Sequence, residues 1–425
     1  MKVYEKIYNF YVNEIEQGLL KAGEKMPSIR ESEKTLNYSR TSIETAYMQL
    51  AADGYIYSVE KIGYFVTETA DIFIKSDTVR DSEHYAESHS AYKYDLSTLG
   101  EDKEVSCLDL WRRYMKSALR QEDRLLMYAS SQGELDLRRE IVAYVRKNRN
   151  IICNPEDVVI GAGFQNLLQV LIALIPGERS ISFPTKNFAD GAMSFYNAGF
   201  EVSYRNKESH VIYVTPSYMT KWGEVMTMKR RHELIEHSLK NDHLIIEDDY
   251  QNEFVFSSKP TPSLYAMTGG ENVAFLGSFS RILLPSVRIS YLILPRGVRK
   301  SYEEIKDKYN QTASMAEQIA LAQFLRDGHL SRHIKRMRRL YQDKKDVMLR
   351  ELESCFKNEA EIFTGESGME IGLKIRRGDI DVDKAPVKVT VIDQDEGETT
   401  LLLSCSIINI SDIPGAILEL KNAFN

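Results

Sequence analysis

Seven short β-rich runs, most of them separated by a segment long enough for a helix, lie between residues 157 and 295. They are DVVIGAG, RSISFP, FEVSYR, HVIYVTP, HLIIEDDY, NVAFLGSF and RISYLILP. Apolar runs that alternate with helices are typical of a largely parallel sheet covered on both faces. We therefore predict an α/β domain over residues 93–425, built on a mostly parallel seven-stranded sheet. In sheets of this kind, ligands bind beyond the carboxyl ends of the strands.

The first 68 residues follow a different pattern. Apolar residues at helical spacing predict a helix over residues 2–18, and Ser28 stands in the N-cap position of a second helix over residues 28–36. A polar turn at 37–39 leads to a third helix over 40–54, and two β-rich runs then predict a hairpin. This order predicts a winged helix-turn-helix, a small DNA-binding domain whose third helix enters the major groove.

Candidate DNA contacts lie at the helix starts and at the tip of the hairpin. They are Arg30, Arg40, Thr41, Ser42, Lys61 and Gly63. Side chains on the first turn of the third helix can reach base edges, while helix N–H groups face phosphates. The chain has a net charge of −7, which argues against non-specific binding to nucleic acid. The alternative to DNA binding is that this N-terminal module serves only for dimerisation. Because the basic residues fall at contact positions, we favour DNA binding.

Residues 69–92 are charged, rich in serine and without steady periodicity, which predicts a linker between the two domains. No apolar run approaches the length of a membrane span, so we expect no membrane partner. The four cysteines lack paired spacing, which indicates free buried thiols in a reducing cytoplasm. His329 and His333 share one helix face, but no third ligand is near; we expect surface positions and no metal site.

Glycines, acids and hydroxyl groups follow several of the predicted strands. The turn Gly161–Gln165 opens a helix, so that Gly163 and Phe164 can present backbone N–H groups to a phosphate. Asp248 and Tyr250 close another strand, where they can bond a protonated ring nitrogen and a phenolic oxygen. Glycines also end strands, and acids cap them, without any ligand. Both interpretations stay open at this point.

The segment GSFSRILLPSVRISY, residues 277–291, completes the candidate pocket. Ser278, Ser280 and Arg288 can together hold an anion at the end of their strand. Arg281 follows Ser280 directly.

Longer stretches of the chain resemble two known families. MPSIRESEKTLNYSRTSIETAYMQLAADGYI, followed by KIGYFV, is similar to the GntR-type winged domain of bacterial repressors, although Lys61-Ile62-Gly63 replaces the usual glycine-serine-glycine tip. The later segments resemble fold-type-I aminotransferases, and the whole chain resembles the MocR subfamily of GntR regulators. These segments are YASSQGELDLRREIVAYVRKNRNI, YVTPSYMTKWGEVMTMKRRHELIEHS, LIIEDDYQNEFVF and RHIKRMRRLYQDKKDVM.

The MocR resemblance implies a head-to-tail homodimer and a site for pyridoxal phosphate. By that resemblance Asp248 would face the pyridine nitrogen and Tyr250 the 3-hydroxyl. The residues that would hold the phosphate are the Gly161–Gln165 turn, Ser278, Ser280 and Arg288. In the family the residue after Ser280 is the lysine that forms the internal aldimine, and here it is Arg281.

Arginine cannot replace that lysine chemically. The aldimine requires a neutral primary amine, whereas a guanidinium stays protonated and has delocalised lone pairs. Other positions depart from the family as well: Ser286 for a glycine, Tyr218 and Met219 for a histidine and a glutamine, and Leu402 or Leu403 for the arginine that binds a substrate carboxylate. This clustering indicates a natural change of the pocket.

We therefore predict a cytoplasmic bacterial transcription regulator whose aminotransferase-like domain has no transaminase activity. Its DNA partner would be an operator. Three roles of the pocket remain open. It could bind a vitamin B6 species non-covalently, it could bind an unrelated acidic effector through Arg281, or it could be empty in a domain that serves only for dimerisation. An active or residual aminotransferase is the further alternative.

Overall fold

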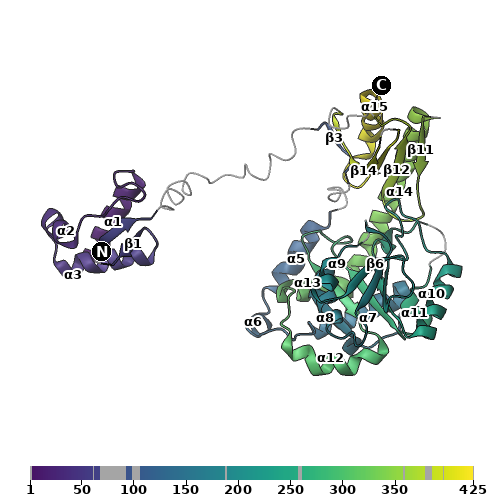
Figure 1. The fold of residues 1–425 in the computed structure, drawn as a ribbon, viewed down its shortest axis with the longest axis horizontal. Coiled ribbons are helices and arrows are strands. Elements are labelled where there is room, and N and C mark those ends of the chain that lie inside the picture. The colour runs from purple at the N-terminus through teal and green to yellow at the C-terminus, as the bar shows by residue number, and fades with distance from the viewer. Residues whose placement is uncertain are drawn as a thin grey trace. The chain divides into compact units, whose positions relative to one another are not determined.

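The computed structural model describes residues 2–60, 62–67, 92–97, 106–186, 189–256, 261–357, 359–378, 385–395 and 397–424. The chain divides into two compact units, Met1–Ser90 and Ala91–Asn425 (Figure 1). Apart from Tyr92, the predicted linker over residues 69–92 lies outside the described residues.

The first unit is a winged helix-turn-helix, as predicted. Its elements are α1 (Val3–Glu16), α2 (Ile29–Leu36), α3 (Arg40–Ala52), β1 (Ile56–Val59) and β2 (Gly63–Val66). Ser28 caps α2 through its hydroxyl, which accepts a hydrogen bond from the backbone N–H of Glu31, while the Glu31 side chain accepts one from the N–H of Ser28. The strands β1 and β2 pair antiparallel.

A buried chain of hydroxyl groups ties the three helices together. The Tyr11 and Ser32 hydroxyl oxygens lie 2.6 Å apart, the Ser32 and Tyr47 oxygens lie 2.9 Å apart, and Tyr47 donates to the carbonyl of Pro27. Because α1, α2 and α3 each supply one of these hydroxyl groups, the hydrogen bonds among them hold the helix-turn-helix in a single geometry.

The second unit is built on one seven-stranded sheet, formed by the seven predicted runs. Its strands are β4 (Val158–Ala162), β5 (Ser180–Phe183), β6 (Glu201–Tyr204), β7 (Val211–Val214), β8 (Leu244–Asp248), β9 (Val273–Ser278) and β10 (Ile289–Ile293). Their order is β4-β10-β9-β8-β7-β5-β6. The pairs along β6-β5-β7-β8-β9 are parallel, and β10 runs antiparallel to both of its neighbours. The sheet is therefore mostly parallel, as predicted.

Helices cover both faces of this sheet. They are α5 (Leu108–Ala118), α6 (Glu122–Leu125), α7 (Leu135–Arg149), α8 (Phe164–Ile172), α9 (Ala192–Asn197), α10 (Met228–Asn241), α11 (Leu264–Thr268), α12 (Arg299–Ile305) and α13 (Met315–Arg326). Successive strand residues belong to two separate cores: Ile246 packs with α8 and α9, whereas Ile245 packs with α7 and α13. Successive side chains along each strand point to opposite faces of the sheet, so alternate residues pack against the two layers of helices.

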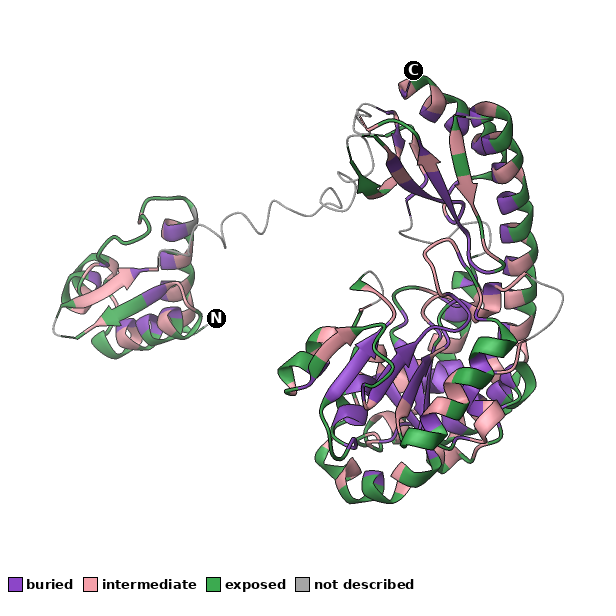
Figure 2. Cartoon of the chain, turned by 45° about the vertical axis from the view of Figure 1, so that its right-hand side comes forward, coloured by how far each residue is buried: buried purple, intermediate pink, exposed green. Residues whose placement is uncertain are grey.

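A smaller sheet, which the sequence patterns did not predict, follows the long helix α14 (His329–Phe356). Its strands are β11 (Ala360–Phe363), β12 (Glu370–Ile375), β14 (Thr390–Gln394) and β15 (Thr399–Ser404), in the order β11-β12-β15-β14, and α15 (Ile413–Ala423) packs on α14. Figure 2 shows α14 running along one side from the large sheet to this one. The short strand β3 (Tyr94–Asp95) pairs with β13 (Val387–Lys388). This pairing attaches the first described residues of the second unit to a strand from the C-terminal part of the same unit.

Candidate functional site

The predicted DNA contacts lie on the surface of the first unit. Ser39 caps α3, so Arg40 and Thr41 occupy its exposed first turn, with Ser42 half-buried beside them. Arg30 is exposed on the first turn of α2, and Gly63 begins β2. Lys61 lies outside the described residues. Arg40 forms an ion pair with Glu44 at 2.9 Å, and its side chain is 61% exposed, so the guanidinium is available to an incoming duplex.

A cavity of about 650 Å³ lies in the second unit, at the carboxyl ends of β8 and β9. Seven of the eight residues predicted for the ligand line it: Phe164, Asp248, Tyr250, Ser278, Ser280, Arg281 and Arg288. The eighth, Gly163, has φ +88°, and a Cβ there would lie 3.0 Å from a guanidinium nitrogen of Arg288. Glu370, Thr390 and Leu402 line the cavity from the smaller sheet, so both sheets of the unit contribute to it.

One end of the cavity is suited to an anion. Gly163 precedes α8, whose first N–H groups have no partner within the helix. The Ser278 hydroxyl oxygen accepts from the backbone N–H of Ser280 at 3.3 Å and from the Ser290 hydroxyl at 3.0 Å, while the Ser280 hydroxyl donates to the carbonyl of Val287. Arg288 is exposed in the cavity and has no ion-pair partner among the described residues. An uncompensated guanidinium beside a helix N-terminus binds phosphate or carboxylate well.

Asp248 ends β8 in the middle of the cavity. Its carboxylate accepts a hydrogen bond from the Tyr213 hydroxyl. Burial raises the pKa of Asp248 to about 6, and this hydrogen bond opposes the rise. The group is therefore mostly ionised at neutral pH and can pair with a protonated ring nitrogen. Tyr250, 42% exposed, stands at the cavity wall with its ring edge-on to that of Tyr218.

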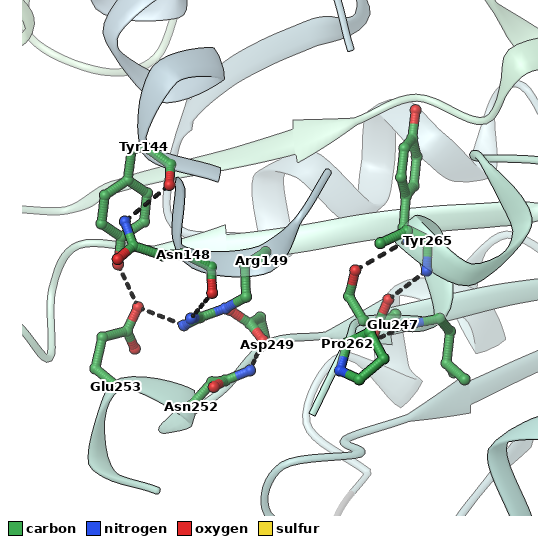
Figure 3. Close-up of polar contacts among 12 residues, drawn as sticks. Tyr144, Asn148, Arg149, Glu247, Asp249, Asn252, Glu253, Pro262 and Tyr265 are labelled. Carbon is green, nitrogen blue, oxygen red and sulfur yellow. Dashed lines mark hydrogen bonds and ion pairs between the residues drawn. The ribbon is translucent and has the colours of Figure 1, made fainter. Parts of the chain in front are cut away.

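A buried ion network, which no sequence pattern predicted, lies behind Asp248 (Figure 3). Arg149, at the end of α7, bonds Asp249 at 2.5 Å and Glu253 at 2.8 Å. Tyr144 donates to Glu253, and Asn252 donates to Asp249. Arg149 supplies one positive charge against these two carboxylates, and the charge of Asp249 adds to the burial that raises the pKa of Asp248.

Glu247, the neighbour of Asp248 on the other side, faces away from the cavity. Its two carboxylate oxygens accept from the backbone N–H groups of Leu264 and Tyr265 at the start of α11. Figure 3 shows these contacts apart from the Arg149 network. Burial raises the pKa of Glu247 to about 7. Its contacts anchor α11 to β8.

Arg281 reaches across the cavity to the smaller sheet. Its Nη2 lies 3.4 Å from Oε1 of Glu370, whose side chain is only 2% exposed. The other oxygen, Oε2, accepts from the Tyr218 hydroxyl at 3.1 Å and from the backbone N–H of Met369 at 2.9 Å. Glu370 therefore compensates the charge of Arg281 within the chain, and Arg281 is held as part of a buried polar cluster.

Several lining residues were missed by sequence reasoning: Lys221, Gln251, Ser290, Glu370 and Thr390. Ser290 faces Ser278 because the antiparallel register of β9 and β10 pairs these two residues. No local sequence pattern predicts this pairing. Glu370 enters from another sheet. Of the two leucines considered for the position of the substrate-binding arginine, Leu402 lines the cavity and Leu403 is buried in the core.

One predicted surface position is wrong. His333 is 7% exposed because it lies in the buried stripe of α14 together with Leu330 and Met337, and this burial lowers its pKa to about 4. Among the described residues there is no cluster of three or more His, Cys, Asp or Glu side chains that could hold a metal ion. No helix in the described part of the chain is long and apolar enough to cross a membrane.

Each of the two units matches a family of known proteins. The family model for bacterial regulatory proteins, gntR family, matches residues 3–66, and the model for aminotransferase class I and II matches residues 98–371. The second unit also resembles a crystal structure of an archaeal alanine:glyoxylate aminotransferase, with a TM-score of 0.69 at 21% identity over 84% of this chain and 94% of the other. This likeness shows the fold.

Three curated relatives extend over most of the chain. An uncharacterized HTH-type transcriptional regulator of Bacillus subtilis, YhdI, is 32% identical over 99% of this chain and 96% of its own. The probable rhizopine catabolism regulatory protein MocR of Rhizobium meliloti is 25% identical over 88% and 82%. The HTH-type pyridoxine biosynthesis transcriptional regulator PdxR of Corynebacterium glutamicum is 27% identical over 79% and 75%.

Proposed function

Because this chain belongs to the MocR subfamily of GntR transcription regulators, in which a helix-turn-helix domain precedes an aminotransferase-like domain, we propose that its cavity senses a phosphorylated vitamin B6 species without transaminase activity. The observation that carries the proposal is the contrast between two arginines. Arg288 is uncompensated among the described residues at the anion end, whereas Arg281 is engaged by Glu370.

The cavity fits a B6 phosphate that is held without a covalent bond. Ser278, Ser280, Arg288 and the Gly163–Phe164 turn would hold the phosphate, and Asp248 would bond the ring nitrogen. Bound pyridoxal phosphate supplies an aldehyde that reacts with amines. At the position of the reactive lysine, Arg281 offers a guanidinium that stays protonated, and its contact with Glu370 fixes it in place. The relative named as a pyridoxine biosynthesis regulator supports a B6 ligand.

The geometry favours this proposal over the alternatives. An acidic effector would be expected at Arg288, because the charge of Arg281 is already compensated. A domain that serves only for dimerisation would not require an uncompensated guanidinium beside three hydroxyl groups in a cavity of about 650 Å³. Residual transamination is disfavoured because Leu402, rather than an arginine, faces the cavity from β15.

We further propose that the protein acts in the cytoplasm as a head-to-tail homodimer. Leu126, Met127 and Tyr128 are consecutive and 83%, 70% and 104% exposed, and apolar side chains gathered in this way mark an interaction surface. A dimer would present two DNA-binding domains to two half-sites, and occupancy of the cavity would alter their spacing.

Two measurements test the proposed function. Native mass spectrometry of the protein with added pyridoxal or pyridoxamine phosphate should show a dimer that gains one ligand mass per subunit and loses it on denaturation. Fluorescence anisotropy should then show that the same ligand changes affinity for DNA from the upstream region of the protein's own gene. A protein that takes up neither compound, or whose DNA affinity ignores them, contradicts the proposal.

A further inference from the structure

Four exposed residues form a stripe without charge along α3. The members of this α3 stripe are Thr41, Thr45, Met48 and Ala52. Spacings of four, three and four residues place them on one side of the helix, and the buried residues of α3 lie on the other side: Ile43, Ala46, Tyr47 and Leu50. The solvent side of a surface helix ordinarily carries charged residues. An uncharged line that includes Met48, which is 66% exposed, therefore indicates a surface for contact with a partner.

The hydroxyl group of Thr45, in the middle of the α3 stripe, is already used inside the helix. It donates a hydrogen bond to the carbonyl oxygen of Thr41 at 2.8 Å. This bond turns Oγ1 back toward the preceding turn, and the staggered arrangement at Cβ directs the methyl group elsewhere. Because a hydroxyl group has a single proton, Thr45 cannot also donate to the edge of a base. It therefore presents chiefly its methyl group to a partner.

The position of the α3 stripe indicates which partner it contacts. It continues along the helix from the first turn, where Arg40 and Thr41 are the predicted DNA contacts, and Thr45 lies about one turn beyond Thr41. Phosphate groups are bound by lysine and arginine, so an uncharged stripe is suited to the bases instead. In the major groove the apolar feature of a base edge is the C5-methyl group of thymine, on which the methyl group of threonine packs.

We propose that Thr45 reads a thymine in the operator by packing its methyl group on the C5-methyl group of the base, and that Met48 extends this apolar contact along the groove. The inference rests on the proposed binding of DNA by the first unit, and it is independent of the ligand of the cavity. It assigns to each half-site of the operator an A·T pair at a fixed distance from the base that Arg40 contacts.

The test replaces thymine by uracil, which lacks only the C5-methyl group. Selection from a random duplex library with the full-length protein provides the operator, and fluorescence anisotropy then measures duplexes in which each thymine is replaced singly. For the wild type we expect at least one replacement to weaken binding about fourfold, which is the effect of one methyl group withdrawn from water. Thr45→Ser deletes the methyl group, keeps the hydroxyl group and should be insensitive to that replacement. Thr45→Val keeps a methyl group, removes the hydroxyl group and should retain the sensitivity.

The outcomes separate this inference from DNA binding itself. The control Thr35→Ser makes the same change at an exposed position on α2 and should behave like the wild type. Sensitivity that survives in Thr45→Ser or is lost in Thr45→Val overturns the role of the Thr45 methyl group, as does a wild type in which every thymine can be replaced without loss; DNA binding by the first unit then still stands. If selection yields no preferred sequence, both fail together. Thermal melting of each variant establishes that it is folded.

Discussion

Nη2 of Arg281 lies 3.4 Å from Oε1 of Glu370, and the two residues are positioned by different sheets. Arg281 follows β9 of the seven-stranded sheet, while Glu370 begins β12 of the smaller one. The pair therefore joins the two halves of the second unit across the cavity. It also gives a structural partner to Arg281, the residue that we predicted at the position of the family's reactive lysine.

Removal of Glu370 should destabilise the protein. Glu370→Ala removes the carboxylate that compensates Arg281, whose side chain is 18% exposed, and we expect a loss of about 3 kcal/mol in the free energy of unfolding. The double variant Arg281→Met/Glu370→Met should recover part of this loss, since it removes both charges, although the Met369 N–H still loses the acceptor that Glu370 supplied. Urea denaturation provides the measurement. Glu233→Ala, which removes an exposed partner of Lys229, is the control and should change stability by less than about 0.5 kcal/mol. A similar loss in the double variant would contradict the explanation.

Arg281→Lys should make the protein reactive toward pyridoxal phosphate. A lysine can supply the neutral amine that a guanidinium cannot, so borohydride treatment should fix the compound on residue 281 in the variant only. Intact-mass measurement detects the adduct, and peptide mapping distinguishes residue 281 from Lys221, which also lines the cavity. A borohydride-stable adduct on the wild-type protein would show that another amine performs the reaction.

Arg288→Gln should weaken the binding of any B6 phosphate. The guanidinium has no partner among the described residues that would compete with the ligand, and loss of a charged hydrogen bond should raise the Kd about tenfold or more. Titration calorimetry measures it. Arg230→Gln, at an exposed position on α10, removes the same charge elsewhere and should have no effect. Equal weakening in both variants would indicate a general charge effect instead of a site.

Asp248 should produce opposite pH dependences of stability and of binding. Its pKa in the folded protein, about 6, lies above the ordinary value of an aspartate because of burial. Its contribution to stability is therefore present at low pH and is lost as the pH rises through about 6. Asp248→Asn should stabilise the ligand-free protein at pH ~7.5 by about 1–2 kcal/mol and change little at pH ~4.

Binding should follow the opposite course, because the ring nitrogen pairs with ionised Asp248. Affinity for pyridoxamine phosphate should fall as the pH drops below about 6, and the Asn variant should bind weakly at every pH. Thermal melting and calorimetry at several pH values provide the data. Identical pH profiles of the wild type and the variant would exclude Asp248 as the titrating group.

Arg40→Ala should reduce specific DNA binding with little effect on folding. Its ion pair with Glu44 is exposed and should contribute less than about 0.5 kcal/mol to stability. Loss of one base contact should cost about 1–3 kcal/mol in binding, which is at least about tenfold in affinity. Anisotropy with operator DNA measures this, and Lys6→Ala on α1 serves as the control. Unchanged specific binding by the Arg40 variant would rule out Arg40 as a base contact.

The first unit and the large sheet could be predicted from the sequence because their signals are local. Ser28, Glu31 and Ser39 cap helices within their own segments. Of the seven runs, all but the one that forms the exposed edge strand β6 have the pattern of a mostly buried strand. The smaller sheet was not predicted. In this sheet β12 lies between β11 and β15, although a long stretch of chain separates β12 from β15.

By itself the sequence determined the order of the elements, the two types of domain and the residues at the carboxyl ends of the strands. A helix cap or a strand pattern depends on neighbours within a few residues. Only the tertiary structure decided which charges in the cavity are compensated. Arg281 and Glu370 are 89 residues apart, Arg149 and Asp249 are 100 residues apart, and Arg288 has no such partner among the described residues. Contacts of this kind depend on how the sheets pack together, and no local pattern in the sequence encodes that packing.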